Sequence, residues 1–346
     1  MPQLKRTLAT VAALLTLSLA IAAFGGIRLH TFLDEPVDVD DSGIVFDIES
    51  GASFGVIASS LQQRGIIASS RMLRLYARWT EQASRVQAGE YLITPGTTPR
   101  ELLQLFTHGS VRLYSFTIIE GWNRWDLLRA LHDQPEIDAS MTDEDWPGLL
   151  DLLGAEMNHP EGMFLPETYY FPSRTSDRVV LRQAFAAMQS ALAEEWANKS
   201  EAAVVTTPYD GLILASIIEK ETARSDERER IAGVFSRRLN KGMRLQTDPT
   251  VIYGLGQDFN GNLTRKDLQT ATPYNTYTKH GLPPTPIAMP GRASIHAALH
   301  PADGEEIFFV ATGSGDGSHQ FSATKEEHDQ AVAAYLRQLK SQRHKE

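Results

Sequence analysis

The chain begins with an uncharged apolar run over residues 7–27. Because an α-helix rises about 1.5 Å per residue, a run of roughly 20 residues is long enough to cross the hydrocarbon core of a bilayer. The run is longer than the apolar core of a typical signal peptide, which has about 7–15 residues. Ala20 and Ala22 do offer small residues to a signal peptidase. We nevertheless expect residues 7–27 to form an uncleaved transmembrane helix.

The charges on either side of this run differ in sign. Lys5 and Arg6 precede it, whereas acidic residues predominate in the stretch 28–43 that follows. Positive flanks remain on the cytoplasmic side of a membrane. We therefore expect residues 1–6 to be a cytoplasmic tail and residues 28–43 a linker, of which 34–43 is acidic and extended. The rest of this single-pass membrane protein should lie outside the cytoplasm.

Composition excludes several classes of function. The chain has 346 residues, enough for more than one domain, and its formal net charge is −10. Nucleic-acid affinity depends largely on clustered Lys and Arg, so this balance argues against a nucleic-acid binder. The absence of cysteine excludes disulfides, thiolate zinc sites, a cysteine nucleophile and a lipid-modified N-terminal cysteine.

A strand–glycine–helix pattern occurs three times between residues 44 and 136. The three segments align on Gly51, Gly96 and Gly121, and a good helix N-cap residue follows each glycine by two positions, namely Ser53, Thr98 and Asn123. Apolar residues then recur on one face of a short helix: Val56, Ile57 and Leu61 in the first segment, Leu102 and Phe106 in the second, and Leu127 and Leu131 in the third. The units resemble LysM modules, which bind the N-acetyl sugars of peptidoglycan and chitin. A purely structural role is the alternative.

We expect a polar, turn-rich boundary from residue 137 and a mixed α+β catalytic domain over residues 137–346. The predicted fold class is therefore α+β, with an N-terminal transmembrane helix, a LysM-like region over 44–136 and the catalytic domain. Apolar periodicity in the catalytic domain predicts helices, a strand and a loop region: helices after Ser176 and over 208–223, 226–239 and 325–340, a buried strand over 307–311, and loops with short strands over 240–300.

Residues 211–218 are apolar on every side, which predicts a buried helix. At 100° per residue, Glu219 continues a stripe of mostly small residues on this helix, formed by Leu212, Ala215, Ser216, Thr222 and Ala223. Glu221 falls on another face, where we expect it to reach solvent. Burial favours the neutral carboxyl group, so Glu219 is a candidate proton donor. The alternative is a solvated ion-pair cluster at a helix end.

The loops after this helix combine aromatic rings with amide and carboxylate groups. Aromatic rings stack on sugar faces, and Asn, Gln and Asp bond sugar hydroxyls, so these loops favour a saccharide groove. The candidate substrate-binding residues are Glu161, Tyr170, Gln246, Asp248, Tyr253, Asn275 and Tyr277. Asp248 lies directly before a proline, so its alternative role is structural, in a turn where its side chain bonds the backbone.

Six ordered segments resemble the YceG-like family: PEGMFLPETYYFP (160–172), ASIIEKE (215–221), RLQTDPTVIYG (244–254), TPYNTY (272–277), GLPPTPIA (281–288) and HQFSATKEEH (319–328). The resemblance implies a bitopic inner-membrane protein with a periplasmic LysM-like subdomain and catalytic domain. It also implies endolytic cleavage of nascent peptidoglycan strands, with peptidoglycan synthases as partners. The catalytic glutamate of the family's Glu-Lys-Glu motif falls on Glu219.

The expected reaction is lytic transglycosylation at the bond between N-acetylmuramic acid (MurNAc) and N-acetylglucosamine (GlcNAc), which leaves 1,6-anhydro-MurNAc ends and requires no cofactor or metal. A hydrolase is one alternative. It would use a second carboxyl group, with Asp248 and Glu161 as candidates, about 5–5.5 Å or 6.5–9.5 Å from the first. A non-catalytic murein-binding scaffold is another. A metallopeptidase is disfavoured because His300, His319 and His328 lack the spacing that places two ligands on one helix face.

Overall fold

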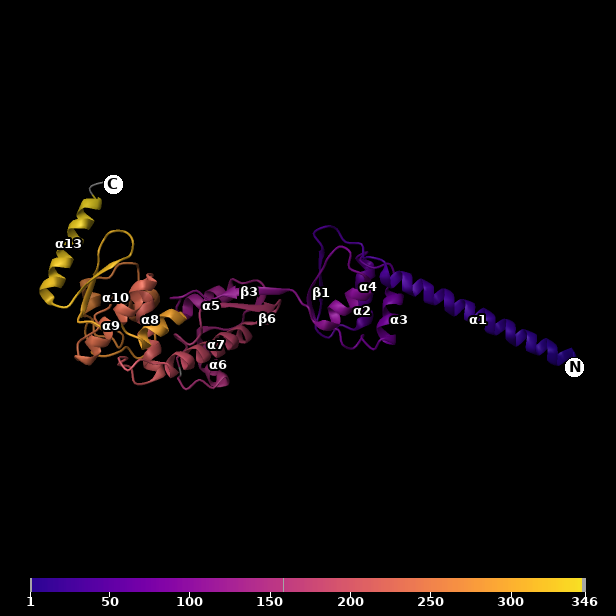
Figure 1. The fold of residues 1–346 in the computed structure, drawn as a ribbon, viewed down its shortest axis with the longest axis horizontal. Helices are drawn as coiled ribbons and strands as arrows, with labels where there is room; N and C mark the ends of the chain where they lie inside the picture. Colours follow the sequence, from indigo (N-terminus) through magenta and orange to yellow (C-terminus); the bar gives the residue numbers. More distant parts are fainter. Residues whose placement is uncertain (1, 158, 344–346) are drawn as a thin grey trace. The chain divides into compact units, whose positions relative to one another are not determined.

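In a computed structural model that describes residues 2–157 and 159–343, the chain divides between Tyr114 and Ser115 into two units (Figure 1). Unit 1 runs to Tyr114 and also includes Phe171–Ser173, and unit 2 contains the rest. The third strand–glycine–helix segment therefore belongs to unit 2, whereas the sequence placed the boundary after residue 136. The functions assigned to the predicted domains remain predictions.

Helix α1 (Pro2–Asp34) contains the apolar run. Its stretch Thr10–Asp34 is long and apolar enough to cross a membrane, a property shared with signal sequences. The helix extends beyond residue 27 to Asp34, so the first part of the predicted linker is helical. The cause is packing: Phe32 and Leu33 are buried in unit 1, and Arg100 Nη2 donates to Asp34 Oδ1 at 3.0 Å.

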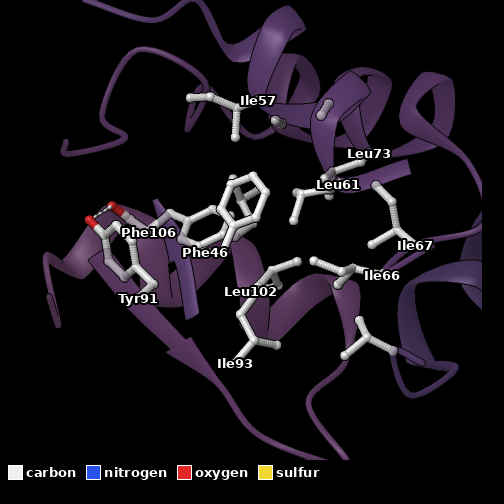
Figure 2. Close-up of a cluster of buried hydrophobic side chains, with 14 of the residues drawn as sticks. Phe46, Ile57, Leu61, Ile66, Ile67, Leu73, Tyr91, Ile93, Leu102 and Phe106 are labelled. Atoms are coloured by element: carbon white, nitrogen blue, oxygen red, sulfur yellow. Dashed lines mark hydrogen bonds between the residues drawn. The ribbon is translucent and has the colours of Figure 1, made fainter. Parts of the chain in front are cut away.

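Unit 1 packs two antiparallel strands against three short helices. The elements are β1 (Ile44–Ile48), α2 (Phe54–Gln63), α3 (Ser70–Trp79), β2 (Gly89–Ile93) and α4 (Pro99–His108). Phe46 pairs with Tyr91 across the strands, and both rings meet Phe106, at centroid distances of 5.9 and 4.8 Å respectively (Figure 2). The hydroxyl of Tyr91 donates to the carbonyl of Gln87 at 2.8 Å. The ring is therefore buried without leaving its hydroxyl group unpaired.

The repeated pattern is confirmed in all three segments. Gly51, Gly96 and Gly121 have φ values of +80°, +84° and +80°, a backbone region that favours glycine. Ser53, Thr98 and Asn123 cap α2, α4 and α5 (Arg124–His132) by accepting hydrogen bonds from backbone N–H groups. One detail was wrong: Val56 is 62% exposed, because the buried face of α2 is formed by Ile57, Ala58 and Leu61.

Unit 2 is predominantly helical and carries short paired strands. Its further elements are β3 (Leu113–Thr117, which begins in unit 1), β4 (Ile137–Asp138), α6 (Trp146–Leu153), β5 (Thr168–Pro172), β6 (Thr175–Ser176), α7 (Asp177–Ala197), α8 (Pro208–Glu221), α9 (Arg228–Asn240), α10 (Asp248–Leu255), α11 (Arg265–Gln269), α12 (Arg292–Leu299), β7 (Phe308–Ala311), β8 (His319–Ser322) and α13 (Lys325–Arg343). Strand β3 pairs with β5, β4 with β6 in parallel, and β7 with β8 as an antiparallel hairpin. The mixed α+β class is confirmed, as are the predicted helices and the strand that becomes β7.

The region 240–300 was predicted incorrectly. The structure describes all of it and forms α10, α11 and α12 there, with no strand. Helix α12 packs closely on α8, where the side chain of Leu299 lies so near Gly211 that a Cβ on this glycine would be 3.1 Å from Leu299 Cδ2. The eight residues of α12 are too few for a clear helical period, and their helical state depends on this packing.

Candidate active site

Glu219 lies in the last turn of α8, with its side chain only 6% exposed. The predicted stripe of α8 faces the extended segment 287–291. Ser216 Oγ accepts the N–H of Ile287 at 3.0 Å, and Glu219 Oε2 accepts the N–H of Gly291 at 3.0 Å. The N–H groups of Ile287 and Gly291, four residues apart, thus bond two side chains that are three residues apart on α8. The Glu219 carboxyl group is held by the backbone, as a reacting group in a fixed orientation must be.

The third glycine turn is bonded to the same segment. The N–H of Gly121 donates to the carbonyl of Met289 at 2.9 Å, and the N–H of Met289 donates to the carbonyl of Trp122 at 2.7 Å. Lys220 Nζ then donates to the carbonyl of Gly121 at 3.0 Å. These bonds hold the 120–122 turn beside the end of α8. The turn therefore forms one wall of the pocket that contains Glu219.

A second carboxyl group, Glu120, lies across this pocket. Arg228 Nη2 is 3.6 Å from Glu120 Oε2 and 3.6 Å from Glu219 Oε1. Those two oxygens are therefore separated by no more than about twice that distance. Burial and the neighbouring Glu219 raise the pKa of Glu120, while Arg228 opposes that shift. The pocket has a volume of about 420 Å³ and is lined by Glu120, Gly121, Glu219, Lys220, Glu221, Thr222, Ala223 and Arg228.

Sequence reasoning missed Glu120 and Arg228. A signal for Glu120 existed, because it stands directly before the third aligned glycine, where the first two segments carry Ser50 and Pro95. An acidic residue at only one of three equivalent positions is a departure from the repeat. Arg228, the first residue of α9, carried no comparable signal, since only the packing of α9 beside α8 brings it to Glu219.

Glu221 was expected to reach solvent, and it is only partly exposed. Its Oε1 accepts a hydrogen bond from the hydroxyl of Thr247, which is itself buried. Burial raises the pKa of Glu221, and the Thr247 hydroxyl opposes that shift. The helical wheel of α8 placed Glu221 on another face correctly, but the 244–248 segment covers that face. The two acids of the Glu-Lys-Glu motif are thus both partly buried, and they lie on different faces of the helix end.

A second pocket of about 350 Å³ adjoins the first and shares Gly121 and Lys220 with it. Its lining includes the aromatic side chains Trp125, Tyr253 and Phe259. The ring centroids of Trp125 and Tyr253 are 5.7 Å apart, and the Arg124 guanidinium lies 4.1 Å from the Trp125 centroid. Tyr253 was a predicted site residue. Trp125 was missed, although its place two residues after the Asn123 cap fixes it at the start of α5.

Glu161 is completely buried. Its Oε2 accepts the N–H of Arg124 at 3.2 Å, and the Tyr253 hydroxyl lies beside the same carboxyl group. Burial raises the pKa of Glu161 to about 7, with the Arg124 N–H and the Tyr253 hydroxyl opposing that shift. The buried Glu161 carboxyl group therefore accepts a hydrogen bond from the first residue of α5. It is not among the residues that line the Glu219 pocket.

The other predicted substrate-binding residues have varied positions. Tyr277 donates to Asp248 Oδ1 at 2.6 Å, so these two side chains form a pair at the start of α10. Asn275 is fully buried and its amide nitrogen donates to backbone carbonyls, including that of Thr270 at 2.7 Å, so it supports its own loop. Gln246 is exposed with φ +51°, and Tyr170 is 63% exposed on β5. None of these five lines the two pockets beside Glu219.

Sequence reasoning missed His296 on α12, which stands four residues before the C-cap residue His300 and so has a spacing that can place two ligands on one helix face. Together with Glu195, these residues bring possible ligand atoms within 4.8 Å of one another. However, Arg292 Nε donates to Glu195 Oε1 at 2.9 Å, which places a positive charge where a cation would lie. Both ring nitrogens of His300 face backbone carbonyls, at 3.0 and 2.8 Å. The group is better described as an ion-paired contact between α7 and α12.

Comparison with known proteins identifies the family of this chain. The profile of the YceG-like family matches residues 46–334. An endolytic murein transglycosylase of Bacillus subtilis (strain 168) is 32% identical over 320 residues, which cover 87% of this chain and 88% of that protein. One from Streptococcus pneumoniae serotype 2 is 25% identical over 92% of this chain, but the match covers only 64% of that protein. The crystal structure of a YceG-like protein from Listeria monocytogenes aligns with a TM-score of 0.51 and 28% identity, over 84% of this chain and 99% of that one. The chain belongs to the YceG-like family.

Proposed function

We propose that this protein is an endolytic murein transglycosylase in which Glu219 acts as both acid and base. The observation that carries the proposal is a nearly buried carboxyl group, fixed by the Gly291 N–H, at the edge of an open pocket. Two relatives that cover most of this chain bear the name endolytic murein transglycosylase. The bond and the product assigned below are our inference from the site chemistry.

The reaction balances with one carboxyl group. Neutral Glu219 protonates the oxygen between C1 of MurNAc and C4 of GlcNAc, and the C1–O bond breaks as GlcNAc leaves with a hydroxyl. The Glu219 carboxylate then takes the proton of the MurNAc C6 hydroxyl, while O6 bonds C1 to close the 1,6-anhydro ring. Glu219 ends protonated as it began, and no water is consumed. The Gly291 N–H holds one carboxyl oxygen still throughout both transfers.

The aromatic pocket supplies a place for a sugar next to the cleaved bond. Trp125 and Tyr253 line it, and Lys220 and Gly121 join it to the pocket of Glu219. Aromatic side chains expose apolar faces and polar edges, which suit a pyranose ring. We infer that a strand occupies both pockets at once, as endolytic cleavage of a chain with sugars on both sides requires.

The membrane and partner assignments extend the same proposal. Helix α1 would anchor the protein in the cytoplasmic membrane with its N-terminus in the cytoplasm, because Lys5 and Arg6 precede the apolar run. The β1–α2–α3–β2 core would serve as a LysM-like glycan-binding unit in the periplasm. Such an arrangement would keep Glu219 near nascent strands and the peptidoglycan synthases that extend them, so that cleavage terminates strand growth.

The decisive experiment compares purified full-length wild type with Glu219→Gln on murein glycan strands. Loss of general acid–base catalysis typically lowers a rate about 10²–10⁴-fold, and we expect a fall of at least about 100-fold with an unchanged circular dichroism melting curve. Glu229→Gln, an exposed glutamate on α9, is the matched control and should retain activity. Mass analysis of the ends should show 1,6-anhydro-MurNAc. Undiminished cleavage by Glu219→Gln would contradict the proposal.

Hydrolysis is the second candidate, and a specific observation favours keeping it. The two carboxyl groups of Glu120 and Glu219 share Arg228, so they are close enough for a two-carboxylate mechanism. Asp248 and Glu161, the carboxyl groups considered from the sequence, do not line this pocket. Product ends separate the two reactions: Glu219-dependent digestion that yields only reducing ends would establish a hydrolase.

A further inference from the structure

We propose that Glu120 is a positioning residue for the proton of this site: it keeps one proton within the Glu120–Glu219 pair so that Glu219 can act as an acid. The inference rests on the proposed function, because it assigns a partner to the proposed acid. It depends on the placement of two carboxyl groups around one guanidinium group. Glu120 has no counterpart in the other two strand–glycine–helix segments.

The position of Glu120 is fixed by contacts on two sides. Its Oε2 lies 3.6 Å from Arg228 Nη2. Its Oε1 lies against the backbone of Gly291, where an added Cβ would be only 1.8 Å away. The absence of a side chain at Gly291 thus lets Glu120 approach, while the N–H of the same glycine donates to Glu219. One residue therefore positions both acids.

The charges around the pair favour a single proton shared between them. From α8 come Glu219, Glu221 and Lys220, whose Nζ is held by the carbonyl of Gly121, and from α9 comes Arg228. The segment 287–291 contributes no ionisable side chain. Arg228 is the cation that both carboxyl groups share, whereas Lys220 bonds a backbone carbonyl, so two ionised carboxylates would repel each other across one guanidinium group.

Strong interaction between two carboxyl groups makes them lose their protons in separate steps that belong to the pair. The side chain of Glu120 is 47% exposed and that of Glu219 only 6%. Burial and the neighbouring Glu219 raise the pKa of Glu120, so the pair keeps one proton to a higher pH than an isolated carboxyl group would. This retained proton is the one that the acid step of the reaction requires.

The test is the dependence of kcat/KM on pH for strand cleavage by the full-length protein. Removing the charge of Glu120 with Glu120→Gln should move the alkaline limb, where activity falls as the pair ionises, to lower pH by about one unit. Removing the charge of Arg228 with Arg228→Met should move the same limb to higher pH. Opposite shifts follow only from a charge effect, because simple structural damage would lower activity without moving the limb.

Each remaining outcome has a defined meaning. An alkaline limb that stays fixed in Glu120→Gln would overturn this inference, provided that the circular dichroism melting curve shows a folded protein. Loss of cleavage at every pH, to the level of Glu219→Gln, would also overturn it and make Glu120 a direct participant in a two-carboxylate mechanism. If wild type does not cleave in a Glu219-dependent way, the proposed function fails instead, so the two failures are distinguishable.

Discussion

The same strand–glycine–helix segment serves two purposes in this protein. In unit 1, a Cβ added to Gly51 or Gly96 would meet nothing within 4 Å, so these turns lie in open space. In unit 2, a Cβ on Gly121 would be 3.6 Å from Lys220 and 4.0 Å from Glu219. The three glycines share nearly the same φ. A similar local conformation therefore borders a hydrophobic core in one unit and forms a wall of the candidate active site in the other.

The helices that follow these turns differ in the same way. Thr98 caps α4 in a closed capping box with Glu101, and the first turn needs no other partner. Asn123 and Asp126 form the equivalent box on α5, but there the N–H of Arg124 also donates to the buried Glu161. A helix N-terminus attracts a carboxylate through its free N–H groups. The third segment is thus attached to its surroundings at both the glycine and the helix start.

The largest expected effect tests whether the core of unit 1 is independent of unit 2. Phe106→Ala removes a fully buried ring that contacts Phe46 and Tyr91, and such changes lower the free energy of unfolding by about 3–5 kcal/mol. Hydrogen exchange of the full-length protein should show lost protection in peptides over 44–108 and little change over 208–240. Val56→Ala, at an exposed position of α2, is the matched control. Equal loss in both regions would show that the two units unfold as one.

The next effect concerns the attachment of α5 to Glu161. The pKa of Glu161 is raised to about 7, above its unfolded value of roughly 4.3. The folded protein therefore holds this proton more tightly, and stability falls as the pH rises from about 4 to 7. Glu161→Gln removes this titration and should raise the stability of unit 2 at pH 8, relative to wild type, by up to about 3 kcal/mol.

Urea unfolding at pH 5 and pH 8 measures the effect of Glu161→Gln. Glu167→Gln, an exposed change in the same segment, should follow the pH dependence of wild type. A wild-type-like pH dependence in Glu161→Gln would mean that the carboxyl group is not held neutral by its burial. The attachment of α5 would then resemble the caps of unit 1 more closely than the structure indicates.

The smallest effect on stability tests the difference between the glycine turns of the two units most directly. Gly51→Ala, Gly96→Ala and Gly121→Ala each force a side chain into left-handed backbone, at about 1–2 kcal/mol of unfolding free energy. Only Gly121→Ala should also lower strand cleavage, by about tenfold or more, because it displaces the turn bonded to Met289 and Lys220. Cleavage rates and urea midpoints of the three variants measure both effects. A similar loss of cleavage in Gly51→Ala or Gly96→Ala would contradict the distinction between the turns.

Local features of this fold were predictable because short-range chemistry determines them. Ser53, Thr98 and Asn123 cap helices as their side chains and positions indicated, and the glycines before them adopt the backbone that favours glycine. The helix that carries Glu219 followed from its uninterrupted apolar sequence. Glu219 itself was selected both by its place on the α8 stripe and by resemblance to the YceG-like family. Its assignment as the catalytic residue remains a prediction.

What the sequence by itself determined is the set of elements with a clear period or cap and the one acid at the end of the buried helix. The tertiary structure alone decided the surroundings of that acid. Glu120 lies about 100 positions before Glu219 in the sequence and Arg228 lies 9 positions after it, and Glu221 accepts a hydrogen bond from Thr247. The reason is physical: propensity and capping act over a few residues, whereas the charge environment of a carboxyl group depends on every segment packed around it.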